Sequence, residues 1–513
     1  MPSEPVATGW PQRLRSPAVQ LALLAAWLLA TMGWRPLLLP DESRYANVAR
    51  EMLRGDALVP TLNGLPFFHK PPLLYWVDLA AMHVAGITPF AARFGPALGA
   101  WIMAAALHAA MRRWHGERAA GIALLVCASC PLFFLSAQYA NHDMLVGGLI
   151  VAAVFAFARA VDTPEAARVE LRWVVIGWAW CALAMLAKGL IGFVLPALVI
   201  GPWLLARGRW RQMLRLLHPL GLLAFAVIAA PWFVAMQARY PAFDDYFFME
   251  QHFRRFSLAT FNNVHPFWFF IVVLPLATLP WSAWLPAAVR RVGAERRAMP
   301  GLYAWWVVAV VGFFSLPSSK LVGYVLPAFA PWCALLALAV AGPRGADPRT
   351  LRGPLGRGAR AALAIGVLVG LGTVAVLCWH TPKSSRGAAL ALAARIAPAD
   401  KVVMVDDYFY DVPFYADLRE PVVIAGNWDD PELPLHDNWR KELYDAARFD
   451  TALGRRVLVP LARLESLACG DGASWFIVAP GAQAARVAAL PGAERVQADR
   501  ASELWRVAAR RCR

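Results

Sequence analysis

Asp-Glu-Ser-Arg-Tyr-Ala at residues 41–46 and Phe-Phe-His-Lys-Pro-Pro-Leu-Leu-Tyr-Trp at residues 67–76 interrupt an otherwise apolar sequence. They lie between a first apolar run, at about 17–35, and a second, at about 92–111. Because a run of about 20 apolar residues is long enough to cross a bilayer, the intervening segment is expected to lie at a membrane face. Its mixture of carboxylates, cations and aromatic rings leads us to interpret it as an active-site loop.

The composition indicates a polytopic α-helical membrane protein. Of the 513 residues, 59% are hydrophobic, and the mean hydropathy is +0.48. Both values are too high for an ordinary soluble protein. We predict about 11 transmembrane helices, and up to about 13 if short juxtamembrane helices are counted. The predicted spans are 17–35, 92–111, 119–137, 144–160, 173–187, 189–206, 216–236, 266–287, 302–317, 321–341 and 361–379.

The arginines predict the orientation of these spans. The formal charge is +16, and every second loop between the spans is rich in arginine. Under the positive-inside rule these loops and the N-terminus are cytoplasmic. The other loops then face outward and hold the sparse polar residues of mixed character, which are Asp41, Glu42, Arg44, Lys70, Asn141, His142, Asp143, Lys188, Glu250, His252, Arg255 and Lys320. Nucleic acid is not an expected partner, because the arginines form no single patch with interleaved aromatic residues.

Two short helices are expected in the first outward loop. Asp41 suits the N-cap of a helix over Glu42–Arg54 that ends at Gly55. Pro71 and Pro72 suit the first turn of a second helix, Leu73–Ala85. Glu42 and Arg44 are expected to form at most a local pair.

A change of composition after the last span predicts a small α/β domain at 383–513. Strand-like runs occur at 401–405, 421–424, 456–459 and 475–478, and helix-like runs at 387–396 and 439–447. We therefore predict a membrane domain at 1–382, with outward loops at 36–91 and 237–265, followed by this domain on the outer side. If it is extracytoplasmic, Cys469 and Cys512 could form a disulfide. No glycine-rich phosphate loop is present, so no nucleotide cofactor is expected.

The quoted motifs resemble the first periplasmic loop of the aminoarabinose lipid A transferases and their protein O-mannosyltransferase-like relatives. These are integral membrane glycosyltransferases of the GT-C class. The similarity extends to Asn-His-Asp at 141–143, Ala-Lys-Gly at 187–189, Glu-Gln-His-Phe-Arg-Arg-Phe at 250–256 and Ser-Lys-Leu-Val-Gly-Tyr-Val-Leu-Pro at 319–327. It covers the whole membrane domain, and the C-terminal extracytoplasmic domain also fits the family.

The resemblance implies a GT-C-like enzyme of the bacterial inner membrane that uses a sugar carried on undecaprenyl phosphate. The acceptor would be lipid A or another molecule at the periplasmic face, and the sugar an amino sugar such as aminoarabinose or glucosamine. Fixed cations stabilise the phosphate leaving group in such a reaction. The candidate donor-binding residues are Arg44, Lys70, Lys188, Arg255, Lys320 and Tyr324. The alternative for Lys70, Arg255 and Lys320 is that they only anchor loops to lipid headgroups, and for Lys188 that it snorkels from the end of a span.

Asp41 and Asp143 are the candidate catalytic carboxylates. Asp41 could deprotonate an acceptor hydroxyl, orient the sugar or pair with its amino group, and the alternative is the helix cap. Asp143 lies at the outward end of a span, where carboxylates tend to be functional, and the alternative is again a cap.

The relatives can hold a divalent metal through an acidic residue before the motif lysine and a histidine in the later loop. Here His69 and His252 stand at those positions. Imidazole suits zinc, but the substitution departs from the family pattern.

Three other functions compete with this interpretation. The same donor could serve a protein or another periplasmic glycan. A transporter would carry ionisable residues inside several spans and often two similar halves, neither of which is found here. A lipid binder without catalysis is the third.

Overall fold

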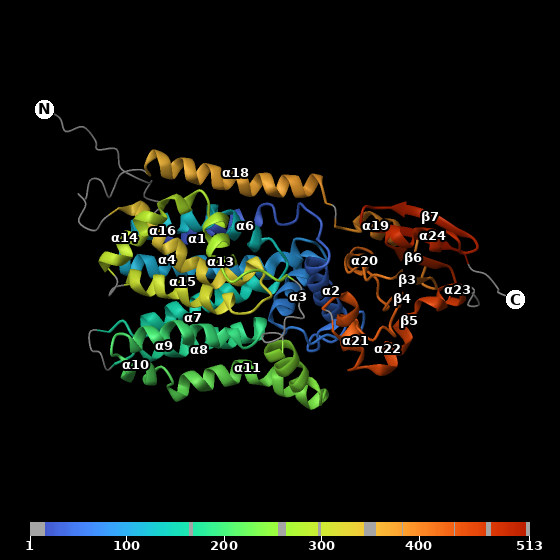
Figure 1. Ribbon diagram of the computed structural model, residues 1–513, viewed down its shortest axis with the longest axis horizontal. Coiled ribbons are helices and arrows are strands. Elements are labelled where there is room, and N and C mark those ends of the chain that lie inside the picture. The colour runs from blue at the N-terminus through green and yellow to red at the C-terminus, as the bar shows by residue number, and fades with distance from the viewer. Residues whose placement is uncertain are drawn as a thin grey trace. The chain divides into compact units, whose positions relative to one another are not determined.

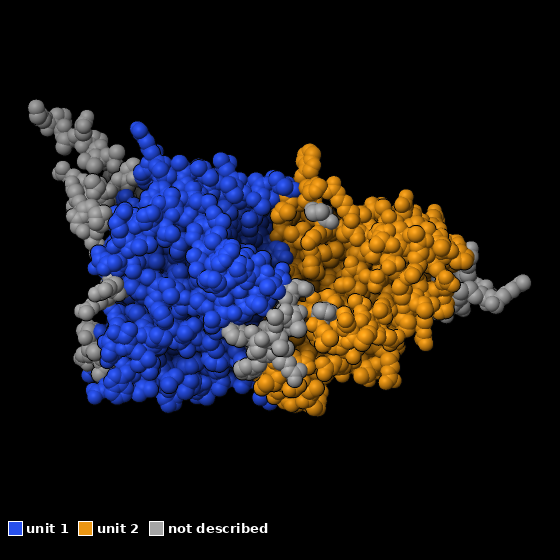
Figure 2. Space-filling model, in the orientation of Figure 1, with its two compact units in different colours: residues 1–32, 95–234, 263–376 blue, residues 33–94, 235–262, 377–513 orange. Residues whose placement is uncertain are grey.

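The computed structural model describes residues 16–163, 168–254, 263–295, 299–342, 355–381, 383–435, 437–467 and 473–508. Arg255, Cys469 and Cys512 lie outside them, as does the side chain of His252. The chain forms two compact units, coloured separately in Figure 2. The helical unit consists of Met1–Met32, Gly95–Val234 and Asn263–Val376, and the mixed unit of Gly33–Phe94, Ala235–Asn262 and Leu377–Arg513.

The helical unit is built from apolar helices (Figure 1). Those before residue 240 are α1 (Pro17–Leu29), α4 (Phe94–His115), α5 (Glu117–Ser129), α6 (Pro131–Ala137), α7 (His142–Ala160), α8 (Leu171–Lys188), α9 (Ile191–Leu205), α10 (Trp210–Arg215) and α11 (Pro219–Arg239). Those after it are α13 (Phe269–Ala277), η4 (Trp281–Trp284), α14 (Leu285–Glu295), α15 (Met299–Ser315), η5 (Val322–Val325), α16 (Leu326–Ala341) and α18 (Arg357–Trp379).

The predicted spans all have helical counterparts among the described residues. Six helices are long and apolar enough to cross a membrane, or eight if each of two bent pairs, α5 with α6 and α13 with η4–α14, is one span. The other predicted spans correspond to the shorter apolar helices α1, α9 and α15. The protein is therefore a multi-pass membrane protein, as the composition predicted.

Helix α7 is the central helix of this unit, and α18 is peripheral. In Figure 1, α7, α8 and α9 lie side by side, and each contacts the other two. In the apolar part of α7, 94% of the residues are buried, whereas in that of α18 only 22% are buried. The exposed residues Leu368, Val369 and Val376 of α18 are thus suited to face lipid.

The mixed unit joins the outward loops to the C-terminal part of the chain. Its elements before residue 260 are α2 (Asp41–Arg54), β1 (Thr61–Leu62), β2 (Leu65–Pro66), α3 (Leu73–Ala85), η2 (Ala91–Arg93) and the π-helix η3 (Asp245–Arg254). The helices and turns that follow are α19 (Arg386–Ala393), α20 (Asp411–Tyr415), η6 (Leu433–Leu435), α21 (Trp439–Ala447), α22 (Thr451–Val457), η7 (Leu461–Arg463), α23 (Leu464–Leu467), η8 (Gly481–Gln483) and α24 (Ala484–Ala488).

A mixed six-stranded sheet organises this unit, in the order β5-β4-β3-β6-β8-β7. Its strands are β3 (Lys401–Val405), β4 (Val423–Gly426), β5 (Leu458–Pro460), β6 (Trp475–Ala479), β7 (Ala493–Ala498) and β8 (Glu503–Val507). Strands β5, β4, β3 and β6 run parallel to one another, and β8 is antiparallel to both β6 and β7. The α/β prediction for the C-terminal part is confirmed.

The two faces of the sheet have different cores, because successive side chains of a strand point to opposite sides. Val402 and Met404 pack in one core with residues of the first outward loop, including Ala46, Ala49 and Met52 of α2. Val403 and Val405 pack in a second core whose other members all follow residue 400. The first outward loop therefore completes the core of the C-terminal sheet. The predicted boundary at 382/383, between the membrane domain and the C-terminal domain, stays a prediction.

Candidate functional site

Asp41 and Arg44 lie one turn apart at the start of α2 and form an ion pair. The helix begins at Asp41 itself, and its N-cap position is Pro40, which makes no side-chain cap. The prediction that Asp41 is the N-cap was therefore wrong by one residue. Its carboxylate bonds Arg44 instead, and 39% of its side chain is exposed. Asp41 is thus oriented by a cation and accessible to a substrate.

Arg44 also pairs with Glu442 of α21, so its guanidinium lies between two carboxylates. The side chains of Arg44 and Glu442 are only 13% and 8% exposed. The hydroxyl of Tyr410 donates a hydrogen bond of 2.8 Å to Glu442 Oε2, and the Tyr45 ring centroid lies 4.9 Å from Arg44 Cζ. Burial works to lower the pKa of Arg44, but Glu442, and then Tyr45 and Asp41, help to raise it well above its usual value.

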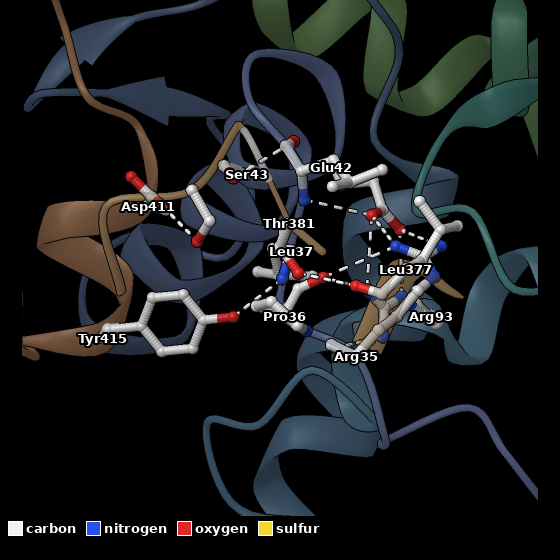
Figure 3. A network of polar contacts seen from close by, with 12 residues as sticks. Arg35, Pro36, Leu37, Glu42, Ser43, Arg93, Leu377, Thr381, Asp411 and Tyr415 are labelled. Atoms are coloured by element: carbon white, nitrogen blue, oxygen red, sulfur yellow. Dashed lines mark hydrogen bonds and ion pairs between the residues drawn. The ribbon is translucent and has the colours of Figure 1, made fainter. Parts of the chain in front are cut away.

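Glu42 belongs to a different network, which holds the start of the first outward loop (Figure 3). It is fully buried between Arg35 and Arg93, and Arg93 Nε donates to its Oε1 over 2.9 Å. The expected pair of Glu42 with Arg44 was wrong, because neighbours two positions apart point to different sides of a helix. Burial works to raise the pKa of Glu42, but Arg93 and Arg35 together lower it from 4.5 to about 2.

His69 and Lys70 follow a phenylalanine that is held in an aromatic cluster. Phe68 packs edge-on against Tyr240, Phe243 and Phe449, with centroids 4.9–5.0 Å away. The buried His69 ring stacks on Phe67 at 4.3 Å. The half-buried Lys70 donates from Nζ to the His69 carbonyl over 2.9 Å. Rings from both outward loops and from the C-terminal part thus hold this motif.

A metal site is not assembled from the described side chains. Within them, no group of three or more His, Cys, Asp or Glu residues is placed to hold a metal ion. The His69 ring lies against those of Phe67 and Tyr246, with centroids 4.3 and 5.9 Å away, and neither residue is one of the usual zinc ligands Cys, His, Asp and Glu. The metal therefore stays a prediction that rests on His69 and His252, and we derive no chemical step from it.

Asp143 and Lys188 form an ion pair in the helical unit, where the start of α7 meets the end of α8. Their side chains are 9% and 16% exposed. The cap of α7 is Asn141, whose Oδ1 accepts from the backbone N–H of Asp143 over 3.0 Å. The carboxylate of Asp143 is therefore not the cap and is held by Lys188.

Gly323 and Tyr324 complete this cluster from the turn before α16. Lys188 Nζ lies 4.7 Å from the Tyr324 ring centroid, a cation–π contact. A Cβ at position 323 would overlap the Asp143 carboxylate, so only glycine allows the turn to approach so closely. Asp143, Lys188 and Tyr324, which were predicted from separate motifs, lie together.

Lys320 lies near this turn in sequence but bonds to backbone oxygens. It is 2% exposed, and its Nζ donates to the carbonyls of His265, Pro317 and Ser318. Its backbone N–H donates to Asn263 over 3.0 Å, beside an antiparallel bridge between Val264 and Ser319. Lys320 thus joins two segments of the helical unit. A phosphate role would require its ammonium to leave these carbonyls.

Sequence reasoning missed the partners of the motif residues. Arg35 and Arg93 enclose Glu42, and Glu442 and Tyr410 hold Arg44. Arg35 and Arg93 are the single arginines at the two ends of the first outward loop, which was a usable signal. No signal in the sequence identified Glu442, because it lies in an ordinary amphipathic helix of the C-terminal part.

Comparisons with known proteins agree with these motifs. Residues 38–247 match the family model for dolichyl-phosphate-mannose-protein mannosyltransferase. The chain is 36% identical over 321 residues to undecaprenyl phosphate-alpha-4-amino-4-deoxy-L-arabinose arabinosyl transferase 2 of Sodalis glossinidius, across 62% of this chain and 58% of that relative. It is 32% identical over 357 residues to the corresponding transferase of Erwinia tasmaniensis, across 69% of this chain and 64% of that relative. The matches thus span less than two thirds of these curated relatives.

A solved structure shares the fold. ArnT from Cupriavidus metallidurans bound to undecaprenyl phosphate superposes with a TM-score of 0.82 at 24% sequence identity, covering 96% of this chain and 98% of that one. The resemblance indicated by the motifs is therefore confirmed: the chain is a relative of the undecaprenyl phosphate-aminoarabinose transferases and has their GT-C-type membrane fold.

Proposed function

We propose that this protein is an integral membrane glycosyltransferase that moves an amino sugar, such as aminoarabinose or glucosamine, from undecaprenyl phosphate to a phosphate of lipid A. The observation that carries the proposal is its 32–36% identity to aminoarabinose transferases over more than 300 residues. The two clusters around Asp41 and Asp143 support it, because each places a carboxylate beside a fixed cation.

The reaction breaks the bond between the anomeric carbon and the donor phosphate oxygen and forms a bond to an acceptor oxygen. Undecaprenyl phosphate leaves with an additional negative charge, which fixed cations stabilise better where water is scarce. Lys70, Lys188 and Arg255 are the proposed donor-phosphate cations, and Tyr324 the proposed hydroxyl donor. Lys320 is the weaker candidate, because its ammonium already bonds to three carbonyls.

Asp41 is the proposed catalytic carboxylate. It orients the sugar or takes up the acceptor proton, and its exposed side chain supports either role. Arg44 holds this carboxylate, so its proposed role shifts from donor phosphate to orientation of Asp41. Asp143 is the proposed second carboxylate, with Lys188 as the group that fixes it.

The proposed location is the bacterial inner membrane, with the N-terminus in the cytoplasm and the outward loops and C-terminal part in the periplasm. The arginine-rich loops at every second position support this orientation. Lipid A phosphates and undecaprenyl-linked sugars would both be available at that face.

The decisive experiment is sugar transfer by the purified protein with undecaprenyl phosphate-linked aminoarabinose or glucosamine and lipid A, followed by mass spectrometry. Asp41→Asn is expected to reduce transfer about 10²- to 10⁴-fold, while donor binding survives. Asp56→Asn is the matched control, because Asp56 is an exposed aspartate of the same unit paired with Arg239. Equal transfer by Asp41→Asn and wild type would reject the catalytic role of Asp41. Donor binding without transfer by the wild type would favour a lipid binder.

A second candidate is transfer of the same type of sugar to a protein or another periplasmic glycan. The match of residues 38–247 to a protein mannosyltransferase family favours it. Mass spectrometry of intact periplasmic proteins, with and without the gene, separates the two acceptors. Unchanged lipid A together with a sugar-sized mass increase on a protein would favour this candidate.

A further inference from the structure

Helix α21 of the C-terminal part supplies a buried carboxylate to the motif at residues 41–46. The Glu442 side chain pairs with Arg44, and Arg44 pairs with Asp41. Within the mixed unit, the most exposed member of this chain of contacts is Asp41, at 39%, and Glu442 is 8% exposed. The contacts therefore run from a buried carboxylate, Glu442, to an accessible one, Asp41.

We propose that Glu442 is a positioning residue for sugar transfer, which fixes the carboxylate of Asp41 through the guanidinium of Arg44. This inference rests on the proposed function and assigns a part in the reaction to the C-terminal domain. Glu442 itself does not touch the substrate.

The geometry of the guanidinium explains how one carboxylate positions the other. Arg44 Nη1 donates to Glu442 and Nη2 donates to Asp41. The guanidinium is planar and rigid, so holding one nitrogen restricts the direction of the other. An amide at position 442 could still accept a hydrogen bond through its oxygen but would carry no charge, so Arg44 would form an ion pair with Asp41 alone.

Glu442 is well suited to be the fixed end. Its Oε2 accepts the 2.8 Å hydrogen bond from Tyr410, a side chain that is 1% exposed. Its helix is anchored at the N-terminus by Asn438, whose Oδ1 accepts from the backbone N–H groups of Arg440 and Lys441 over 2.9 and 3.1 Å. Tyr410 and Asn438 are the N-cap residues of α20 and α21, so Glu442 and its partners are held at the ends of two helices.

The competing explanation is that Glu442 only neutralises a buried arginine. In that case its loss would lower stability and reduce the amount of active enzyme, with the turnover of the folded fraction unchanged. Positioning predicts a different result, because a displaced Asp41 lowers kcat per folded molecule while the binding of the donor lipid is retained.

The experiment compares Glu442→Gln with wild type in steady-state transfer, normalised to folded protein. We expect kcat to fall about ten- to a hundredfold and the donor KM to change less than about twofold. Glu442→Asp keeps the charge and is expected to recover part of the lost kcat. Arg440→Gln is the matched control, because Arg440 lies on the same helix but pairs with Asp430 at 3.3 Å.

A double-mutant cycle tests the route through Asp41. In an Asp41→Asn background, Glu442→Gln should cause no further loss of kcat. Fully multiplicative losses would overturn the inference, and so would an unchanged kcat in Glu442→Gln alongside an active wild type. If Glu442→Gln fails to fold, Glu442→Asp is compared with wild type in the same cycle.

A readout without catalysis separates this inference from the proposed function. Carbodiimide labelling of Asp41, followed by peptide mass spectrometry, is expected to be several times faster in Glu442→Gln and unchanged in Arg440→Gln. An inactive wild type with this labelling pattern would reject the proposed function and retain the link between Glu442 and Asp41. Equal labelling of Asp41 in all three proteins would overturn that link.

Discussion

The two units hold their candidate catalytic carboxylates in different ways. In the helical unit, Asp143 pairs with Lys188, and the two residues come from helices adjacent in the sequence, α7 and α8. In the mixed unit, arginines bridge carboxylates and carbonyls that lie far apart in the sequence, as Arg44 does between Asp41 and Glu442. The lysine ammonium is a compact point charge on a flexible stem, whereas the planar guanidinium fork holds two carboxylates in a fixed relation to each other. The arginine networks therefore both orient the carboxylates and assemble the unit.

The largest expected effect is the loss of the Glu42 carboxylate, because two arginines would then remain buried without it. Glu42→Gln is expected to lower the free energy of unfolding by about 3–5 kcal/mol at pH 7. The folded pKa of Glu42 is lowered to about 2 from 4.5. Its stabilising contribution is therefore present above about pH 5 and lost as the pH falls toward 2.

Melting temperatures of the detergent-solubilised protein, measured between pH 7 and pH 3, test this expectation. Glu117→Gln in the helical unit is the control, because Glu117 pairs with Arg112 at an exposed site and should contribute less than about 1 kcal/mol. Equal melting temperatures of the two variants would contradict the structural role of the arginine network.

Asp411 in the mixed unit, whose described hydrogen-bond partners are serines, should show the opposite pH dependence. Asp411 Oδ2 accepts from Ser384 Oγ over 2.9 Å and from the Ser385 N–H over 2.6 Å. Burial raises the pKa of Asp411 from 3.8 to about 7. The folded state thus binds the proton more tightly, so stability is greatest below about pH 4 and falls as the pH rises toward 7.

Asp411→Asn should remove this dependence, since the amide oxygen still accepts both hydrogen bonds. The variant is expected to match wild type near pH 4 and to be more stable by up to about 4 kcal/mol at pH 8. Thermal melts across that range measure the difference. A less stable variant at pH 8 would mean that the charged carboxylate is stabilised by its surroundings.

In the helical unit, removing one member of the ion pair should cost about 2 kcal/mol, because both side chains are mostly but not fully buried. Lys188→Met leaves Asp143 without its cation, whereas Lys188→Met with Asp143→Asn removes both charges. The double variant is expected to recover most of the melting temperature, although neither variant should transfer sugar at the wild-type rate. A double variant that is less stable than Lys188→Met would show that the pair is not the main interaction of Asp143.

The smallest expected effect concerns Lys320. Lys320→Gln keeps a donor for some of the three carbonyls and should cost about 1 kcal/mol, with the donor KM unchanged. Melting temperature and steady-state kinetics of the same preparation measure the two quantities. A donor KM raised tenfold or more with an unchanged melting temperature would restore Lys320 as a phosphate ligand.

Local signals predicted the elements well. Helix α3 begins after Pro71-Pro72 and ends before Gly86, as predicted, and strand β3 covers the predicted residues 401–405. Strands β7 and β8 were not predicted, because polar residues such as Glu494, Arg495 and Gln497 disrupt the strand pattern at this edge of the sheet. The local sequence pattern is thus sufficient to predict a helix or strand where buried and exposed positions alternate regularly.

The residues of the candidate site could be predicted from the sequence, but the contacts between them could not. The motifs identified Asp41, Asp143 and Lys188, and sidedness placed them at one membrane face. The pairing of Arg44 with Glu442 joins positions almost 400 residues apart, and no local pattern encodes it. The aromatic cluster around Phe68 likewise depends on Phe449. Contacts of this kind follow only from the tertiary fold.

The composition of the mixed unit from three separated segments has a consequence for biosynthesis. Residues 33–94 leave the ribosome early, but the sheet that covers Ala46 and Met52 begins only at residue 401. Translation proceeds at about 5–20 residues per second, so the sheet is synthesised on the order of 20–60 seconds after the first outward loop. During that time its apolar side chains are uncovered. The core around Ala46 and Met52 can therefore be completed only after the sheet strands have been translated.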